Sequence, residues 1–180
     1  MNDVSKINYD RESYIMVVDD DQTLLKFFKI HLNKFFSKVV VVKNANEASE
    51  VLKNKKIDLV LSDIRMPRTD GLQLLKRIRN FDASIPVFLI SGEFVDEEMQ
   101  EKVDSLADGF LRKPFTIEEI QNFINLGLKK RKLLLELSGL VGDNKVLLDL
   151  LRGKASTARL KESDLISKAD DLLSDLKKVS

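Results

Sequence analysis

Five short apolar runs alternate with amphipathic segments along the first two thirds of the chain. The runs are YIMVVD, VVVV, IDLVLSD, PVFLISG and GFLRKP, beginning at residues 14, 39, 57, 86 and 109. Each run is continuous rather than alternating, which is typical of a strand covered on both faces. The segments between them repeat apolar residues at helical spacing, as at Leu24, Leu25, Phe28 and Leu32. The pattern predicts strands and helices in alternation.

This alternation predicts the fold class and points to one edge of the sheet. Strands joined by right-handed helical crossovers form a parallel sheet with helices on both faces. We therefore expect an α/β fold with a doubly wound, five-stranded parallel sheet, followed by an α-helical C-terminal extension. In such sheets the ligand lies beyond the carboxyl ends of the strands, so the residues that end each run are the candidate site.

Four of the five runs end in residues that carry chemistry. The first ends in Asp19 and Asp20, the third in Asp63, the fourth in Ser91 and the fifth in Lys113. Carboxylates with an open side suit a hard cation such as Mg²⁺, while an ammonium and a hydroxyl would meet the charge of a phosphoryl group. Asp63 ends its run alone and is the better candidate for a nucleophile, whereas Asp19 and Asp20 can share a metal ion.

The acidic triplet has a second interpretation. Asp19, Asp20 and Asp21 directly precede an amphipathic segment, and acidic residues are favourable at a helix start. We expect Asp21 to be the N-cap of that helix and the first two residues to belong to the site.

The motifs VVDDD, LSDIRMPRTDGLQLL, PVFLISG and FLRKPF together resemble the receiver domain of bacterial two-component response regulators, over about residues 13–115. The resemblance implies a flavodoxin-like fold in which Asp63 accepts a phosphoryl group. It also implies that Asp20 and Asp63 bind Mg²⁺ directly, that Asp19 acts partly through water, and that the backbone carbonyl of Arg65 completes the metal site.

The same resemblance implies a conformational switch. Lys113 is the expected phosphate-binding lysine, and its bond to Pro114 is expected to be cis. On phosphorylation Ser91 would move toward the phosphoryl group and Phe110 would turn inward. This movement would alter the face formed by the fourth helix, the fifth strand and the fifth helix.

Two departures from the family pattern bear on this site. Arg65 and Glu93 occupy the variable positions that set the rate of aspartyl-phosphate hydrolysis in the family, and both are long and charged. Leu106 stands where the family usually has Gly after the fourth helix, so we expect a different corner there, using Gly109.

Composition adds mostly exclusions. The 180 residues are 43% hydrophobic and 33% charged, with a net charge of +1 and no Cys. Disulfides and thiolate sites are excluded, and no strong field favours nucleic acid or a membrane as partner. No apolar run reaches the ~18 residues that span a bilayer, so we expect a cytoplasmic protein. The only basic cluster, KKRK at 129–132, is interpreted as a solvated helix face.

The sequence predicts three parts: a polar tail over 1–12, a receiver domain over 13–128 and a helical extension over 129–180. From the end of the receiver domain into the extension, Leu126, Leu133, Leu140 and Leu147 follow heptad spacing with Asn144 at an a position, which favours a parallel dimeric coiled coil. A helical hairpin within one chain is the alternative.

The predicted function is that of a response regulator. A histidine kinase or phosphotransfer protein would supply the phosphoryl group, and a downstream protein partner or a homodimer would read the change. The alternatives are a DNA-binding regulator with a compact, divergent output module and a receiver scaffold that acts without phosphorylation. A nucleotide-binding enzyme would need a Gly-rich loop after the first strand, and DDDQT contains none. The single histidine, His31, is expected to be structural.

Overall fold

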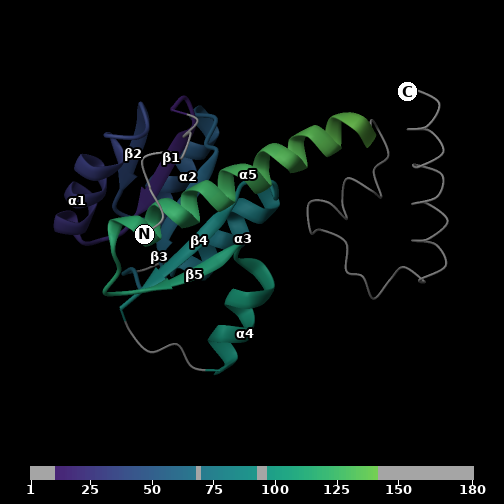
Figure 1. Ribbon diagram of the computed structural model, residues 1–180. Coiled ribbons are helices and arrows are strands. Elements are labelled where there is room, and N and C mark those ends of the chain that lie inside the picture. The colour runs from purple at the N-terminus through teal and green to yellow at the C-terminus, as the bar shows by residue number, and fades with distance from the viewer. Residues whose placement is uncertain (1–10, 68–69, 93–96, 142–180) are drawn as a thin grey trace. The chain divides into compact units, whose positions relative to one another are not determined.

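The computed structural model describes residues 11–67, 70–92 and 97–141 of the chain. Five strands and five helices alternate in it (Figure 1). The strands are β1 Tyr14–Val18, β2 Lys38–Val42, β3 Leu59–Asp63, β4 Val87–Ser91 and β5 Gly109–Arg112. The helices are α1 Gln22–Leu32, α2 Ala45–Asn54, α3 Gly71–Phe81, α4 Glu97–Leu106 and α5 Ile117–Val141.

All neighbouring strands of the sheet pair in parallel, in the order β2-β1-β3-β4-β5. The strand order reverses between β1 and β3, which is the switch point of a doubly wound sheet. The predicted fold class is therefore confirmed: a five-stranded parallel sheet of flavodoxin-like type, followed by a C-terminal helix.

Helices cover both faces of the sheet (Figure 1), and a hydrophobic cluster lies beneath them on each face. On one face, Leu25 and Phe28 of α1 pack in one cluster with Ile120 and Ile124 of α5. On the other face, α2, α3 and α4 cover the sheet, with Leu75 of α3 fully buried in the second cluster. Because β1, β3 and β4 lie inside the sheet, they are buried along almost their whole length.

The two edge strands differ from the prediction that every run is covered on both faces. In β5 only Leu111 is buried and Arg112 is exposed, while in β2 Val40 and Val41 are only partly buried. An edge strand has a neighbour on one side only, so the helices beside it cover it incompletely. The prediction of full burial was wrong for these two strands.

The helix starts depend on polar caps. The Asp21 carboxylate accepts the backbone N–H groups of Thr23 and Leu24 at the start of α1, as predicted. These hydrogen bonds hold the pKa of Asp21 below its usual value. Asn44 and Asp70 cap α2 and α3 in the same way. The first turns of α1, α2 and α3 thus each begin at a defined polar residue.

The corner between α4 and β5 is built around Arg79 of α3. Its Nε donates to the Leu106 carbonyl at 3.0 Å, so a side chain satisfies the end of α4. Gly109 begins β5, and a Cβ there would lie 2.8 Å from the ring of Phe123. Gly109 is therefore required by packing.

The chain consists of two compact units, a first unit that ends at Lys132 and a second unit over residues 133–180. The predicted coiled-coil positions from Leu140 to Leu147 and Asn144 have side chains outside the described part of the chain. In the basic cluster 129–132, the three lysines are exposed, as predicted for a solvated face, and only Arg131 departs from the prediction. Arg131 is buried, because it forms ion pairs with acidic residues of the first unit.

Candidate functional site

The carboxyl ends of β1, β3 and β5 bring three of the predicted site residues together. The Lys113 ammonium lies 2.7 Å from Asp63 Oδ1 and 3.0 Å from Asp19 Oδ2. Both carboxylates are buried, with relative exposures of 2% for Asp19 and 6% for Asp63. One ammonium therefore bridges two carboxylates that are almost out of contact with water.

Backbone contacts hold each member of this triad in place. The Lys113 N–H donates to the Ser91 carbonyl at 2.7 Å, and the Lys113–Pro114 bond is cis, as predicted. The other oxygen of the Asp19 carboxylate accepts the Asp21 N–H at 2.8 Å. The cap of α1 is thus joined directly to the site.

The surroundings of Asp63 disfavour its charged form. Burial raises the pKa of the Asp63 carboxyl, and its bond to Lys113 opposes this without cancelling it. The neighbouring Asp19 carboxylate also raises the pKa of Asp63. Burial alone would lower the pKa of Lys113, but its hydrogen bonds to Asp63 and Asp19 outweigh that and raise it. Lys113 is therefore a fixed cation.

The loop after β3 folds back against Asp63. Gly71, the first residue of α3, donates its N–H to the Ile64 carbonyl at 2.8 Å. A Cβ on Gly71 would lie 2.3 Å from the Asp63 carbonyl oxygen, which no side chain can do. Our sequence reasoning did not single out Gly71, although the Asp-Gly pair in the quoted motif LSDIRMPRTDGLQLL was a usable signal.

The remaining predicted residues lie around this triad. Ser91 is buried at the carboxyl end of β4, and Phe110 of β5 packs, partly buried, on a core cluster. Asp20 and Arg65 are exposed, and the Arg65 backbone N–H hydrogen-bonds to the Asp63 carboxylate. Glu93 lies outside the described residues.

The carboxylates of the site are possible ligands of a metal ion. Among the residues described, no three acidic or histidine side chains approach closely enough to hold one. Two buried carboxylates nevertheless share a single cation, and their oxygens are the donors that Mg²⁺ prefers. The chemistry of Asp19 and Asp63 fits a divalent cation, with Asp20 as the next residue along the chain.

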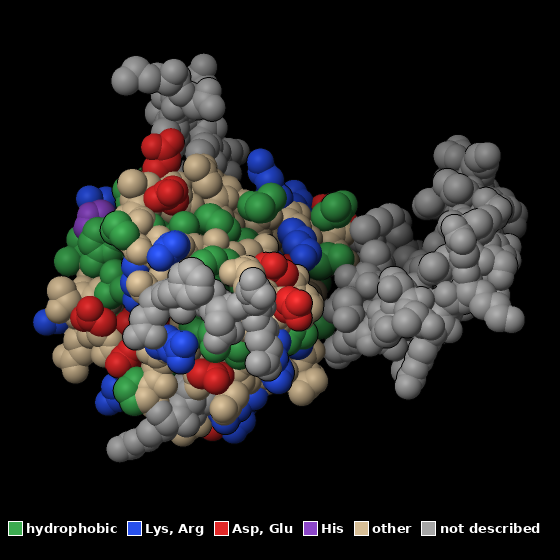
Figure 2. All heavy atoms as spheres, turned by 90° about the horizontal axis from the view of Figure 1, so that it is seen from below, with side chains coloured by type: hydrophobic (Ala, Val, Ile, Leu, Met, Phe, Trp, Pro, Cys, Tyr) green, Lys and Arg blue, Asp and Glu red, His purple; other side chains and the backbone are tan. Residues whose placement is uncertain are grey.

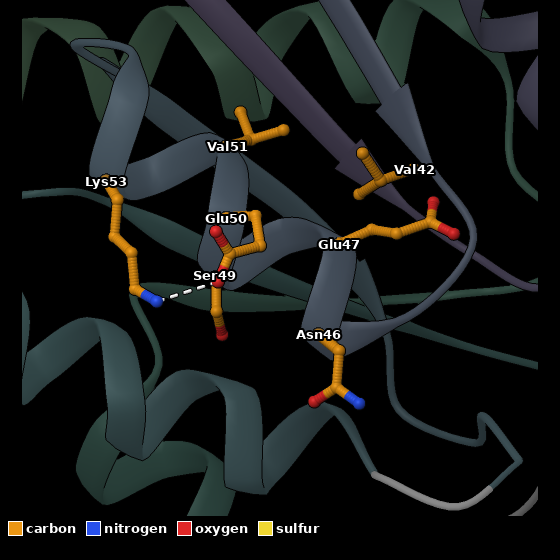
Figure 3. A pocket seen from close by; sticks show the side chains of 7 residues that line it. All are labelled: Val42, Asn46, Glu47, Ser49, Glu50, Val51 and Lys53. Carbon is orange, nitrogen blue, oxygen red and sulfur yellow. Dashed lines mark hydrogen bonds and ion pairs between the residues drawn. The ribbon is translucent and has the colours of Figure 1, made fainter.

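Other surface features lie apart from the site. His31 of α1 bonds through Nδ1 to the Phe27 carbonyl at 2.8 Å, and its ring lies 4.2 Å from that of Phe27. This matches the predicted structural role. On the face in Figure 2, acidic and basic side chains are interspersed and hydrophobic ones gather beside the histidine. A shallow cavity of about 700 Å³ on α2, beside the Glu50–Lys53 ion pair (Figure 3), contains none of the predicted site residues.

The structure is that of a doubly wound α/β protein. Its site, formed by two carboxylates and a lysine, lies at the carboxyl ends of the strands, where the strand order reverses. The family profile of the response regulator receiver domain matches residues 15–125 of this chain. The chain therefore belongs to the response regulator receiver family.

Curated relatives agree with this assignment. The transcriptional regulatory protein ZraR of Klebsiella oxytoca is 33% identical over 119 residues, which are 66% of this chain and 27% of ZraR. The virulence transcriptional regulatory protein PhoP of Salmonella typhimurium is 32% identical over 106 residues, which are 59% of this chain and 47% of PhoP. The autoinducer 1 sensor kinase/phosphatase LuxN of Vibrio campbellii is 28% identical over 64% of this chain and 14% of LuxN. The chain thus spans less than half the length of each of these relatives.

Solved structures show the same architecture. A response regulator receiver domain from Clostridium thermocellum aligns with a TM-score of 0.63 at 26% identity, covering 68% of this chain and 98% of that one. The receiver domain of a Francisella response regulator aligns with a TM-score of 0.60 at 28% identity, covering 66% and 98%. No helix among residues 11–67, 70–92 and 97–141 is long and apolar enough to cross a membrane.

Proposed function

We propose that this chain accepts a phosphoryl group on Asp63 from the phosphohistidine of a histidine kinase or a phosphotransfer protein. The observation that supports this most strongly is the Lys113 ammonium, which lies within hydrogen-bonding distance of both the Asp63 and Asp19 carboxylates. A buried carboxylate beside a fixed cation has both the nucleophile and the charge needed to hold a transferred phosphoryl group.

The proposed transfer is a displacement at phosphorus. An Asp63 carboxylate oxygen attacks, the new O–P bond forms as the P–N bond breaks, and the bonding electrons leave with the imidazole nitrogen, which takes a proton from water. Lys113 stays protonated, because its pKa is raised, and offsets the added negative charge. The output is a change in protein contacts.

Asp19, Asp20, Asp63 and the backbone carbonyl of Arg65 are the groups proposed to hold Mg²⁺. When bound, the ion would supply positive charge to the phosphoryl oxygens. Added positive charge would offset the effects of burial and of the Asp19 carboxylate, which keep the pKa of Asp63 raised despite its bond to Lys113.

The proposed switch uses Ser91 and Phe110. Ser91 is buried at the end of β4, and Phe110 is half-buried on the neighbouring strand β5. We propose that the Ser91 hydroxyl moves toward a phosphorylated Asp63 and that Phe110 then fills the space behind it. Arg65 and Glu93 are proposed to set the lifetime of the phosphoryl group. The α4–β5–α5 face and the C-terminal helices would present the change to a protein partner or a second copy of the chain, in the cytoplasm.

Intact-mass spectrometry with a small phosphodonor tests the acceptor. With acetyl phosphate and Mg²⁺ we expect the full chain to gain the mass of one phosphoryl group. Asp63→Asn should abolish the gain, whereas Asp104→Asn, at an exposed residue of α4, should leave it intact. Phosphorylation of Asp63→Asn to the level of the natural chain would contradict the proposal, and so would a natural chain that gains no phosphoryl group.

Size-exclusion chromatography with light scattering tests the output. We expect beryllofluoride with Mg²⁺, a mimic of an aspartyl phosphate, to change the mass or shape of the natural chain and to leave Asp63→Asn unchanged. Binding of the mimic without any such change would exclude a homodimer as the readout and leave a different protein as the partner.

A further inference from the structure

The hydrophobic contacts of α5 with the sheet end before its basic segment. Ile120 and Ile124 are fully buried, and Phe123 and Leu128 pack against the same cluster. The next residues of the first unit are four cations, 129–132. The last turn of α5 in this unit is therefore held mainly by charged side chains.

Arg131 joins this turn to two loops at the amino ends of the strands. Its side chain is only 6% exposed, and Nη1 lies 3.1 Å from Ser84 Oγ and 3.4 Å from Asp82 Oδ2, both between α3 and β4. Its Nε lies 3.4 Å from Asp58 Oδ1, between α2 and β3, and makes an ion pair without a hydrogen bond. Asp58 also accepts the Tyr14 N–H at 2.8 Å, where β1 begins.

Lys130 joins the same turn to the third loop, between α4 and β5. Its ammonium pairs with Oδ1 of Asp108, whose side chain is only 7% exposed. The other oxygen of Asp108 accepts the Val87 N–H at 2.7 Å and the Arg79 guanidinium at 2.5 Å. Two consecutive residues of α5 thus contact all three loops that lead from a helix into β3, β4 and β5.

Solvent reaches these ion pairs. The side chains of Lys130 and Asp82 are 54% and 34% exposed, and a cavity of about 340 Å³ beside Arg131 is lined by Asp82, Phe81 and Lys56. Ions in solution can therefore screen the Lys130 pair, and the buried Arg131 pairs to a smaller extent, whereas the apolar contacts of Ile120 and Ile124 carry no charge to screen. Salt should therefore weaken the contacts of Lys130 and Arg131 and leave those of Ile120 and Ile124 intact.

We propose that Lys130 and Arg131 form an electrostatic latch that holds the last turn of α5 in the first unit, and that this latch opens locally while the sheet stays folded. The latch contacts the amino ends of the strands, whereas Asp63 and Lys113 lie at the carboxyl ends. The end of α5 can therefore open without any change at Asp63 or Lys113. The latch does not depend on the proposed phosphoryl transfer.

Hydrogen exchange on the full chain tests the latch with three matched variants. Lys129→Met, Lys130→Met and Arg131→Met each remove one positive charge from the same turn with similar helix propensity. We expect Lys130→Met to speed amide exchange in residues 126–132 roughly three- to fivefold, a factor typical of a lost exposed ion pair. Arg131→Met should speed it by more, because its guanidinium is buried. The exposed Lys129 makes no ion pair with the described residues, so Lys129→Met should change exchange less than about twofold.

Salt provides a second reading that needs no variant. Raising sodium chloride from about 0.1 M to about 1 M shortens the Debye length from about 10 Å to about 3 Å and should speed the same amides in the natural chain. Lys130→Met should respond less to salt, because one screened pair is already lost.

Three results would overturn the latch. One is equal acceleration by all three variants, which would make the effect one of net charge. Another is acceleration of β1 and β3 amides together with those of α5, which would make the pairs part of global stability. The third is exchange in α5 that neither salt nor Lys130→Met changes. Should Arg131→Met fail to fold, Lys130→Met and the salt series still decide between these results.

Discussion

Asp63 is a residue whose charge the folded protein disfavours. Its pKa is raised above the ordinary value of 3.8 because burial and the Asp19 carboxylate outweigh the bond to Lys113. Between 3.8 and the raised pKa the folded state binds more protons at this position than the unfolded state. Ionisation of Asp63 therefore reduces the stability of the fold as pH rises through this window.

Asp63→Asn should remove this pH-dependent loss. Asn keeps the shape and an oxygen that accepts from Lys113, while Asp19 remains as the counter-ion of Lys113. We expect the variant to unfold at a higher temperature than the natural chain at neutral pH, by the order of a few degrees, and the gap to shrink toward pH 4. Calorimetry from pH 4 to 8 checks this. A gap that is constant with pH, or of opposite sign, would contradict the electrostatic account.

Gly71 is the second residue on which the site depends. Ala at this position would bring its Cβ to 2.3 Å from the Asp63 carbonyl, so the loop that carries Asp63 must shift. We expect Gly71→Ala to reduce the free energy of unfolding by about 2 kcal/mol or more in urea titrations. Gly92→Ala is the control, because a Cβ there would meet Lys113 at ordinary distances of 3.5 and 3.6 Å. Equal effects of the two substitutions would argue against the steric explanation.

At the scale of elements, sequence reasoning succeeded where a pattern is local. The continuous runs identified the strands that lie inside the sheet, and Asp21 was recognised as a cap because its partners are two and three residues away. It failed where tertiary contacts decide. Arg131 lies in a run of cations that has the composition of a solvated face, yet its acidic partners Asp58 and Asp82 are 73 and 49 residues away in the chain.

Gly127 shows the same limit within α5. Glycine in a helix interior costs roughly 1 kcal/mol relative to Ala, so the sequence alone suggests a weak point. In the structure a Cβ there would lie 2.6 Å from both Leu59 Cδ1 and Phe88 Cε2, so glycine is what lets the helix approach β3 and β4.

Replacing Gly127 by Ala should therefore lower the stability of the fold, although Ala has the higher helix propensity. We expect Gly127→Ala to destabilise the fold by about 1 kcal/mol, because overpacking of 1–3 kcal/mol exceeds the gain in propensity. Asn122→Ala, at an exposed position of the same helix, should be slightly stabilising. Chemical denaturation of the two variants checks the opposite signs, and a stabilised Gly127→Ala would show that Leu59 and Phe88 yield easily.

At the scale of the whole molecule, Asp108 links elements that are distant in the sequence. Its buried carboxylate accepts from β4, from Arg79 of α3 and from Lys130 of α5. The sequence gives no sign of this, because an acidic residue between a helix and a strand is usually solvated. The site triad was recognisable only because the parallel topology places strand ends at one edge.

Neutralising Asp108 should weaken the whole fold. Asp108→Asn leaves the partly buried Arg79 without its counter-ion, and we expect a loss of about 3 kcal/mol in the free energy of unfolding. Asp104→Asn removes the same charge from an exposed residue of α4 and should stay within about 0.5 kcal/mol of the natural chain. Thermal or urea unfolding of both measures the difference, and a small effect of Asp108→Asn would mean that Asn replaces the carboxylate fully.

The position of β1 inside the sheet, between β2 and β3, has a consequence for the order in which a growing chain completes its site. All residues that pair β1 with β3 have been synthesised once residue 63 is made, and this pairing brings Asp19 and Asp63 to the same edge. Lys113 follows 50 residues later, a delay of roughly 3–10 s at ordinary rates of synthesis. During that interval a paired β1 and β3 would hold the Asp19 and Asp63 carboxylates without their cation. Addition of β5 brings Lys113, which offsets the negative charge at the end of the first strand.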